Sequence, residues 1–291
     1  MPNNIALAQQ FVPILDEIYV NASLTAKLDG NPELVQQGAN ANELIIPMLD
    51  MQGLGDYSRN DGYVKGDVTL TNETVKCNFD RGRMFTIDAM DNQETANIAF
   101  GRLAGEFIRT KVVPEVDAFR FAKYASDEGI SKPSAGATLT TGEAVVAALR
   151  AATNKMDEDE VPEEGRILYA TPTLLNGVMA LDTTKSREIL NSFTIKKKVP
   201  QSRFYTAIDL LDGKTPGEEV GHYRKAEGGK DINFMIVHKP AVLKWDKHTA
   251  SDVIDPSINS ESDAYISKYR KYGIVDVYKN KVAGIYLSHK N

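Results

Sequence analysis

Two short glycine-containing segments have residue types that could bind phosphate, but neither completes a phosphate-binding pattern. Gly213-Lys214-Thr215 matches the end of a phosphate loop, yet that loop needs a glycine where Ile208 stands and a helix afterwards. The next residues are Pro216-Gly217, which favour a turn. Gly53-Leu54-Gly55 is followed by Ser58, where a dinucleotide-binding fingerprint has glycine or alanine. We interpret both segments as surface turns.

Residues that bind metals or act as nucleophiles are few and poorly spaced. The four histidines match no metal-ligand pattern, and Cys77 is interpreted as a packed small hydrophobe. The acidic run 157–164 and the three lysines at 196–198 are interpreted as solvated surface. We therefore predict no catalytic residue, no metal site and no cofactor. A catalytic triad dispersed along the chain stays open.

Composition excludes several classes of protein. With 42% hydrophobic residues the 291-residue chain can build a core, which argues against disorder. A single cysteine excludes an internal disulfide. The sequence contains no run of 18 apolar residues, so no membrane-spanning helix is predicted. The net charge of −6 argues against a general nucleic-acid binder. A reducing intracellular setting is expected.

The region before the longest helical pattern indicates a hairpin that cannot fold alone. Leu44–Leu49 predicts a strand, and residues 50–66 predict an exposed, glycine-rich loop. Residues 67–79 predict a second strand, which turns at Asp80-Arg81-Gly82 and returns over 85–87. Such a hairpin has half a hydrophobic face and is marginal in water. We expect it to bind another surface, of its own chain or of a neighbour.

A long helix and a separate α/β unit follow. Residues 92–113 and 114–126 predict two helical segments that meet at Pro114 and together span about 50 Å. Residues 143–258 alternate helices with strands and predict a compact unit. In the tail, residues 265–278 and 282–288 predict a hairpin. The tail is expected to join the N-terminal half around the inserted unit.

The sequence resembles tailed-bacteriophage major capsid proteins over most of its length. The resemblance is carried by Phe85-x-Ile87-Asp88-x-x-Asp91, by Gly101-x-Leu103-x-x-Glu106-x-x-Arg109 and by Val112-Val113-Pro114-Glu115-Val116-Asp117-Ala118-x-Arg120. Upstream, Leu54-x-Asp56-Tyr57-x-Arg59 is similar to the extended loop of that family. Downstream, Tyr269-x-x-Tyr272-Gly273 and residues 281–286 are similar to its closing hairpin.

The resemblance implies the Hong Kong ninety-seven capsid fold, an α+β fold. It implies an N-terminal arm over 1–43 and an extended β-hairpin loop over 44–88. A peripheral domain, with a long spine helix and a closing β-hairpin, is implied over 89–138 and 259–291, and an axial α/β domain over 139–258. Residues of the loop and spine are then expected to contact neighbouring subunits: Tyr57, Arg59, Phe79, Arg81, Arg83, Glu115 and Asp117.

The implied function is structural. Copies of the chain would form pentamers and hexamers of an icosahedral shell around phage double-stranded DNA, without enzymatic activity. The implied partners are the chain itself, a separate scaffolding protein, a portal and packaged DNA bound non-specifically, with no membrane. The implied location is the virion, assembled in the bacterial cytoplasm. Two alternatives stay open: an encapsulin-like nanocompartment shell, and a soluble α/β enzyme with a dispersed site.

Overall fold

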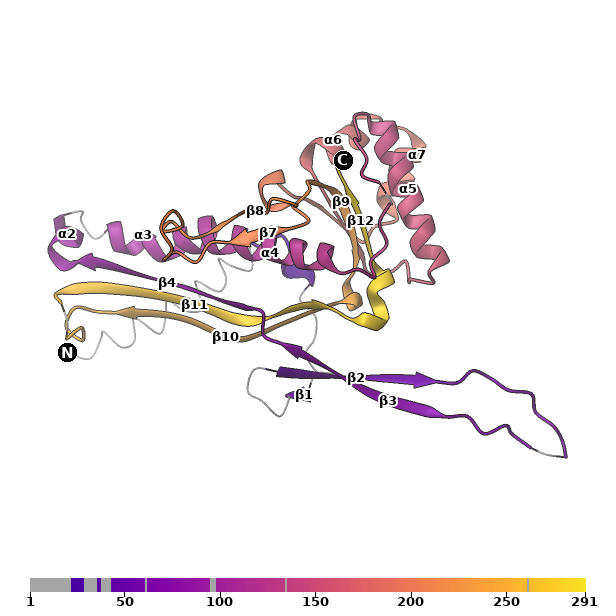
Figure 1. The fold of residues 1–291 in the computed structure, drawn as a ribbon. Helices are drawn as coiled ribbons and strands as arrows, with labels where there is room; N and C mark the ends of the chain where they lie inside the picture. The colour runs from indigo at the N-terminus through magenta and orange to yellow at the C-terminus, as the bar shows by residue number, and fades with distance from the viewer. Residues whose placement is uncertain are drawn as a thin grey trace.

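The computed structural model describes residues 22–28, 36–37, 43–60, 62–94, 98–133, 135–260 and 262–291. The chain is elongated, with a compact α/β part at one end, a long sheet that runs beside the spine helices, and a projecting hairpin (Figure 1). Most of the predicted N-terminal arm lies outside the described residues. Within the described ranges, no helix has the length and apolar character that a membrane crossing requires.

The spine is helical on both sides of Pro114, as predicted. A backbone N–H of Val113 bonds the carbonyl of Ile108, one residue further back than in an α-helix, so a π-helical segment precedes the proline. Pro114 has no N–H and sits in the first turn of the next helix, where none is needed. The spine comprises α2 (Ala89–Glu94), α3 (Ile98–Phe107), the π-helical segment (Ile108–Val112) and α4 (Val113–Ser126).

A three-stranded antiparallel sheet runs along the spine in the order β10-β11-β4. Its strands are β10 (Val242–Ile254), β11 (Ala264–Val277) and β4 (Phe79–Asp88). The predicted turn at residues 80–82 is wrong, because these residues lie inside β4 and pair with residues 270–272 of β11. Gly82 allows the backbones of β4 and β11 to approach closely, because a Cβ at this position would lie 2.7 Å from the carbonyl oxygen of Tyr269.

The projecting hairpin consists of β2 (Glu43–Met51) and β3 (Val68–Lys76). It confirms the strand predicted at 44–49, which continues to Met51, and it confirms an exposed loop after it, over 52–67 instead of the predicted 50–66. The second strand of the hairpin pairs with β2 and not with residues 85–87. A short β1 (Gln36–Gln37) pairs with the other edge of β2. At the root of the hairpin, buried side chains of β2 and β3 pack against buried side chains of β10 and β11. The hairpin contributes Leu44, Ile46 and Val75, and the long sheet contributes Leu243 and Ile274.

The compact part holds a four-stranded sheet in the order β12-β9-β5-β6, and its helices pack against it. Helix α5 begins after Thr141, whose hydroxyl accepts from the N–H of Ala144. The predicted helix at 143–156 and the strands at 167–170 and 232–237 are confirmed. The elements are α5 (Gly142–Glu158), α6 (Pro172–Ala180), α7 (Thr184–Asn191), β5 (Arg166–Ala170), β6 (Ile195–Lys198), β9 (Ile232–His238) and β12 (Ile285–His289).

The predicted tail hairpin is wrong. Strand β11 pairs with β10 and β4, whereas β12 pairs with β9, and a 3-10 helix (Lys279–Gly284) carries the chain from one sheet to the other. Since β10 lies in the long sheet and β12 in the compact one, the sheets cross the predicted domain boundaries. One buried cluster, which includes Phe121, Tyr169 and Val275, joins α4 to both sheets.

Candidate assembly interface

The distal half of the hairpin exposes apolar side chains that have no core of their own. Eight of the thirteen exposed large hydrophobic residues in the described chain lie on β2, β3 or the loop between them, and Leu54 and Tyr63 are among the most exposed, at 107% and 86%. An exposed apolar patch on a soluble protein commonly marks a binding surface. The eight are Leu49, Met51, Leu54, Tyr57, Tyr63, Val64, Val68 and Leu70.

The tip of this loop is ordered by a small turn. Ser58 and Gly62 exchange two backbone hydrogen bonds, of 3.2 and 2.8 Å, and Gly62 has a φ of +77°. The turn brings the rings of Tyr57 and Tyr63 to a centroid distance of 4.8 Å. Arg59 is exposed beside them. The tip therefore presents two aromatic rings and a cation at the far end of the projection.

Ion pairs fix the root of the hairpin to the rest of the chain. Lys279 Nζ lies 2.7 Å from Glu73 Oε1, and the side chain of Glu73 is only 11% exposed. This hydrogen bond raises the pKa of Lys279. Together with the apolar cluster at the root, the pair holds one end of the hairpin firmly while its other end projects freely (Figure 1).

A buried carboxylate joins the spine, β4 and the segment that follows residue 211. Arg81 Nε donates to Glu115 Oε1 at 2.7 Å, and His222 Nδ1 lies 3.2 Å from Glu115 Oε2. Arg81 Nη2 also donates to the carbonyl of His222 at 3.3 Å. Burial acts to raise the pKa of Glu115, but the hydrogen bonds and charges of His222 and Arg81 outweigh it and lower that pKa.

Arg83 closes the neck of the loop over residues 213–221. Its Nη2 donates to the carbonyl of Glu219 at 3.2 Å. Gly213 and Gly221 have φ values of +73° and +68°, and a Cβ on Gly213 would lie 2.9 Å from Arg83 Nη1. The loop thus needs glycine at both ends of its neck, for conformation and for room. The loop lies between β7 (Ile208–Leu210) and β8 (Tyr223–Lys225) in the chain.

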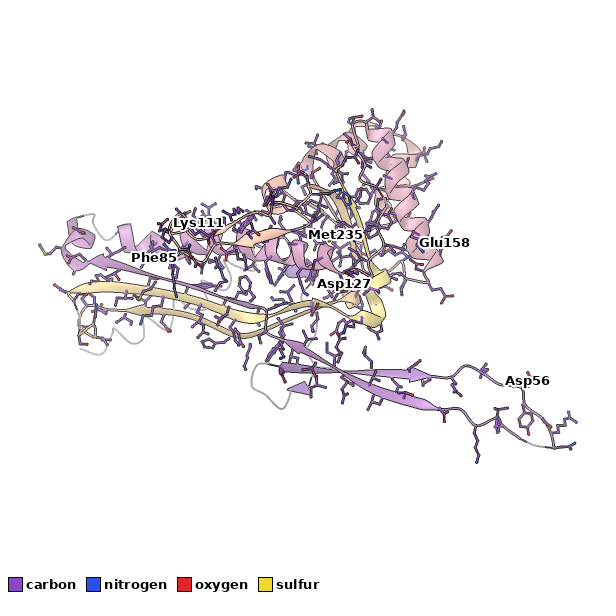
Figure 2. All side chains as sticks on the ribbon, viewed as in Figure 1. Asp56, Phe85, Lys111, Asp127, Glu158 and Met235 are labelled. Carbon is purple, nitrogen blue, oxygen red and sulfur yellow. The ribbon has the colours of Figure 1, made fainter. Side chains whose placement is uncertain are left out.

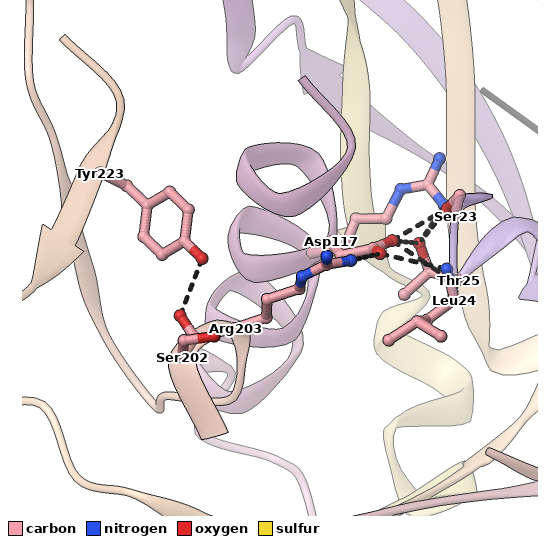
Figure 3. Close-up of polar contacts among 8 residues, drawn as sticks. Ser23, Leu24, Thr25, Asp117, Ser202, Arg203 and Tyr223 are labelled. Carbon is pink, nitrogen blue, oxygen red and sulfur yellow. Dashed lines mark hydrogen bonds and ion pairs between the residues drawn. The ribbon is translucent and has the colours of Figure 1, made fainter. Parts of the chain in front are cut away.

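A second buried carboxylate fastens the N-terminal segment to the spine (Figure 3). Asp117 is fully buried and accepts from the hydroxyls of Ser23 at 2.9 Å and Thr25 at 2.6 Å, and from the backbone N–H groups of Leu24 and Thr25. Arg203 Nη1 lies 3.5 Å away. A carboxylate with this many donors is satisfied by its own chain.

The seven predicted contact residues fall into two groups. Phe79, Glu115 and Asp117 are buried within the chain, and Arg81 pairs with Glu115, so these four side chains contact other parts of the same chain. Tyr57, Arg59 and Arg83 are exposed. For all seven residues, contact with a neighbouring copy stays a prediction.

Sequence reasoning missed Glu73, His222 and Lys279, because their partners are distant in the chain. Glu115 and His222 are 107 residues apart, and no local pattern signals such a pair. Glu73 lies on a predicted strand, three residues after the exposed Leu70, and nothing in that pattern signals that a lysine from the tail pairs with it.

The described residues contain no group of three or more His, Cys, Asp or Glu side chains placed to hold a metal. Gly213-Lys214-Thr215 forms a turn, as predicted: Asp212 accepts from the backbone N–H groups of Lys214 and Thr215 and from the Thr215 hydroxyl. These hydrogen bonds, the Thr215 hydroxyl foremost, lower the pKa of Asp212 to about 2. Cys77 is half-buried and belongs to the cluster at the hairpin root.

Comparison with known proteins identifies the fold. No family model and no curated protein matches the sequence. Among solved structures, a chain from Mycobacterium phage Che8 is 11% identical with a TM-score of 0.58, and the match covers 91% of this chain and 90% of that one. The capsid of cyanophage P-SCSP1u is 12% identical with a TM-score of 0.58, covering 93% and 88%. A virus-like particle from Pyrococcus furiosus is 12% identical with a TM-score of 0.57, covering 94% and 95%.

The architecture is therefore the α+β capsid fold of tailed phages, the Hong Kong ninety-seven fold. The match spans nearly the whole length of both chains, so the projecting hairpin, the spine and the compact α/β part belong to one architecture. The fold class predicted from the sequence is confirmed.

Proposed function

We propose that this chain is a major capsid protein, many copies of which assemble into the icosahedral head shell that encloses phage double-stranded DNA. Two findings support the proposal: the capsid fold, and a hairpin whose apolar surface has no partner within the described chain. The same chain shows no metal-binding cluster among its described residues. In this proposal it is a structural protein, it uses no cofactor, and it is not an enzyme.

The exposed hairpin is the observation that carries the proposal. Its root is fixed by the cluster around Leu44 and by the Glu73–Lys279 pair, while its distal half buries nothing. A two-stranded hairpin is marginal in water unless another surface covers it. A second copy of the same chain supplies that surface in a closed shell, where many modest contacts add to a large buried area.

The proposed partners follow from the same role. Copies of the chain form pentamers and hexamers, a separate scaffolding protein guides assembly, and a portal occupies one vertex. Packaged DNA contacts the wall non-specifically, and the net charge of −6 limits how strongly it adheres. The proposed location is the virion, after assembly in the bacterial cytoplasm.

Assembly of the purified chain tests this function. We expect the chain to form closed particles, with or without a co-expressed scaffolding protein, that are visible by electron microscopy and sediment far ahead of the monomer. Particle formation should depend steeply on protein concentration, because each subunit makes several weak contacts at once. A chain that stays monomeric up to millimolar concentration under both conditions contradicts the proposal.

A second candidate is an encapsulin-like nanocompartment shell that encloses a protein cargo. The match to the virus-like particle from Pyrococcus furiosus, which covers 94% of this chain, favours it. The contents of particles recovered from the native source separate the two candidates. Nuclease-protected double-stranded DNA inside supports the phage head, whereas a single abundant protein and no DNA supports the nanocompartment.

A further inference from the structure

A groove runs between β4, the spine and the loop after residue 211. Its volume is about 380 Å³, and its lining is rich in charged side chains. The acidic members of this lining already have partners within the chain. Glu115 binds Arg81 and His222, Asp80 binds Arg270 at 2.7 Å, and Asp212 accepts from its own turn.

Three basic members of the lining lack such partners, whereas Arg81 and Lys271 are paired with Glu115 and Asp246. Arg83, Lys111 and Lys214 are exposed, and none of them lies within 4.0 Å of a carboxylate oxygen among the described residues. Within the described ranges Arg83 makes one hydrogen bond, to a backbone carbonyl, and its other N–H donors have no partner there. The groove therefore carries an uncompensated positive charge and suits an acidic ligand.

The complementary surface lies at the end of α5. Six carboxylates fall within residues 157–164, and two of them are paired: Asp157 with Arg166 at 2.7 Å and Asp159 with Lys155 at 2.6 Å. The others are exposed and have no cation partner in the described chain. These four residues form the acidic corner: Glu158, Glu160, Glu163 and Glu164.

The groove and the acidic corner cannot meet within one subunit. Figure 2 labels Lys111 beside the spine and Glu158 at the outer end of the compact part, and the two lie on well-separated parts of the chain. A contact between two different patches on identical chains is head-to-tail, and such contacts close into rings when the rotation between neighbours allows it.

We propose that the acidic corner of one copy docks into the groove of its neighbour, as a head-to-tail contact within a capsomer. The proposal rests on the shell function, and it names the residues that set the order of subunits around the ring. Opposed charge accelerates and orients this encounter and makes it sensitive to salt. DNA phosphate is the competing occupant of a basic groove. The acidic corner is favoured because it belongs to the same chain and leaves four carboxylates unpaired.

A charge swap tests the contact. Lys111→Glu with Lys214→Glu reverses the groove, and Glu160→Lys with Glu163→Lys reverses the corner; Arg83 is kept because it holds the loop. We expect each double variant to lower the yield of particles at least tenfold at physiological salt, and the fourfold variant to restore it. Lys185→Glu with Lys268→Glu changes the net charge equally at exposed sites elsewhere and should assemble normally.

Three outcomes of the charge swap overturn the proposal: normal assembly of both double variants, failure of the fourfold variant although circular dichroism shows it folded, and a groove variant that assembles normally but binds less DNA. The last outcome assigns the groove to phosphate.

Chemical cross-linking separates this proposal from the shell function. A bis-maleimide should join Lys214→Cys to Glu163→Cys in a mixture, above the background from Cys77. Cross-linked dimers without particles support the contact and contradict the shell function. Particles without cross-links support the shell function and contradict the contact.

Discussion

Glu115 is the residue at which three distant segments meet. It is only 9% exposed, and its carboxylate is hydrogen-bonded to Arg81 of β4 and to His222. Hydrogen bonds to a charged group contribute about 1.5–3 kcal/mol each, and a buried charge that loses its partner is strongly destabilising. Charge reversal at Arg81 therefore acts on the folding of the subunit before it acts on any contact between subunits.

The lowered pKa of Glu115 fixes the sign of a pH effect. A carboxylate whose pKa is lower in the folded state stabilises the fold above its unfolded pKa, and this contribution disappears as the pH falls through the folded value. We expect Glu115→Gln to lower the free energy of unfolding by about 2 kcal/mol at pH 7. The difference should shrink below about pH 4.5 in urea unfolding. An equal difference at pH 7 and pH 3.5 would assign the effect to shape rather than charge.

Asp117 gives a second prediction at this scale. In Asp117→Asn one oxygen becomes an NH₂ group, which faces donors from Ser23, Leu24 and Thr25. We expect a loss of about 2–3 kcal/mol, together with faster hydrogen exchange of residues 23–28. Asp209→Asn, at an exposed pair with Arg224, is the matched control and should change the stability by less than about 0.5 kcal/mol. Unchanged exchange in the Asp117 variant would show that the segment is held by other contacts.

At the scale of elements, Gly82 is a position at which β4 packs closely against β11. A Cβ there would meet the backbone of Tyr269 at 2.7 Å, whereas Gly53 has nothing within 4 Å of its Cβ position. We expect Gly82→Ala to cost about 1–3 kcal/mol by forcing β4 and β11 apart, and Gly53→Ala to leave stability unchanged. Thermal unfolding of the two variants checks this. Equal stability would mean that the sheet adjusts without cost.

Local patterns predicted the elements but not their partners. The spine, α5, β5 and β9 carry periodic apolar residues or proline positions that act within a few residues, so the sequence reveals them. Residues 80–82 have the composition of a turn, and only pairing with a strand about 190 residues later makes them part of β4. The tail hairpin failed for the same reason, because the short 3-10 helix at Lys279–Gly284 passes between sheets. The charged contacts Glu115–His222 and Glu73–Lys279 likewise depend on the finished fold.

At the scale of the whole molecule, the chain has a part that buries its apolar side chains in its own cores and a part, the distal hairpin, that leaves them exposed. Two buried clusters tie the spine to the two large sheets, a third packs α5, α6 and α7 on the compact sheet, and a fourth holds the hairpin root. The distal hairpin contributes to none of them. Changes there should consequently separate assembly from folding, which changes at Arg81 or Glu115 cannot do.

Leu54 and Leu70 offer the sharpest form of that separation, since both are exposed on the hairpin, at 107% and 63%. Burial of a leucine side chain against a neighbour contributes about 1.5–3 kcal/mol, and every 1.4 kcal/mol changes an equilibrium tenfold. We expect Leu54→Ser with Leu70→Ser to raise the protein concentration needed for particles more than tenfold, measured by light scattering. Urea unfolding of the monomer should stay within about 0.5 kcal/mol of the unaltered chain. Met179→Ser with Ile258→Ser removes exposed apolar surface away from the hairpin and should leave assembly unchanged. If both pairs of substitutions affect assembly equally, the hairpin is not the specific contact, because general surface hydrophobicity then accounts for the association.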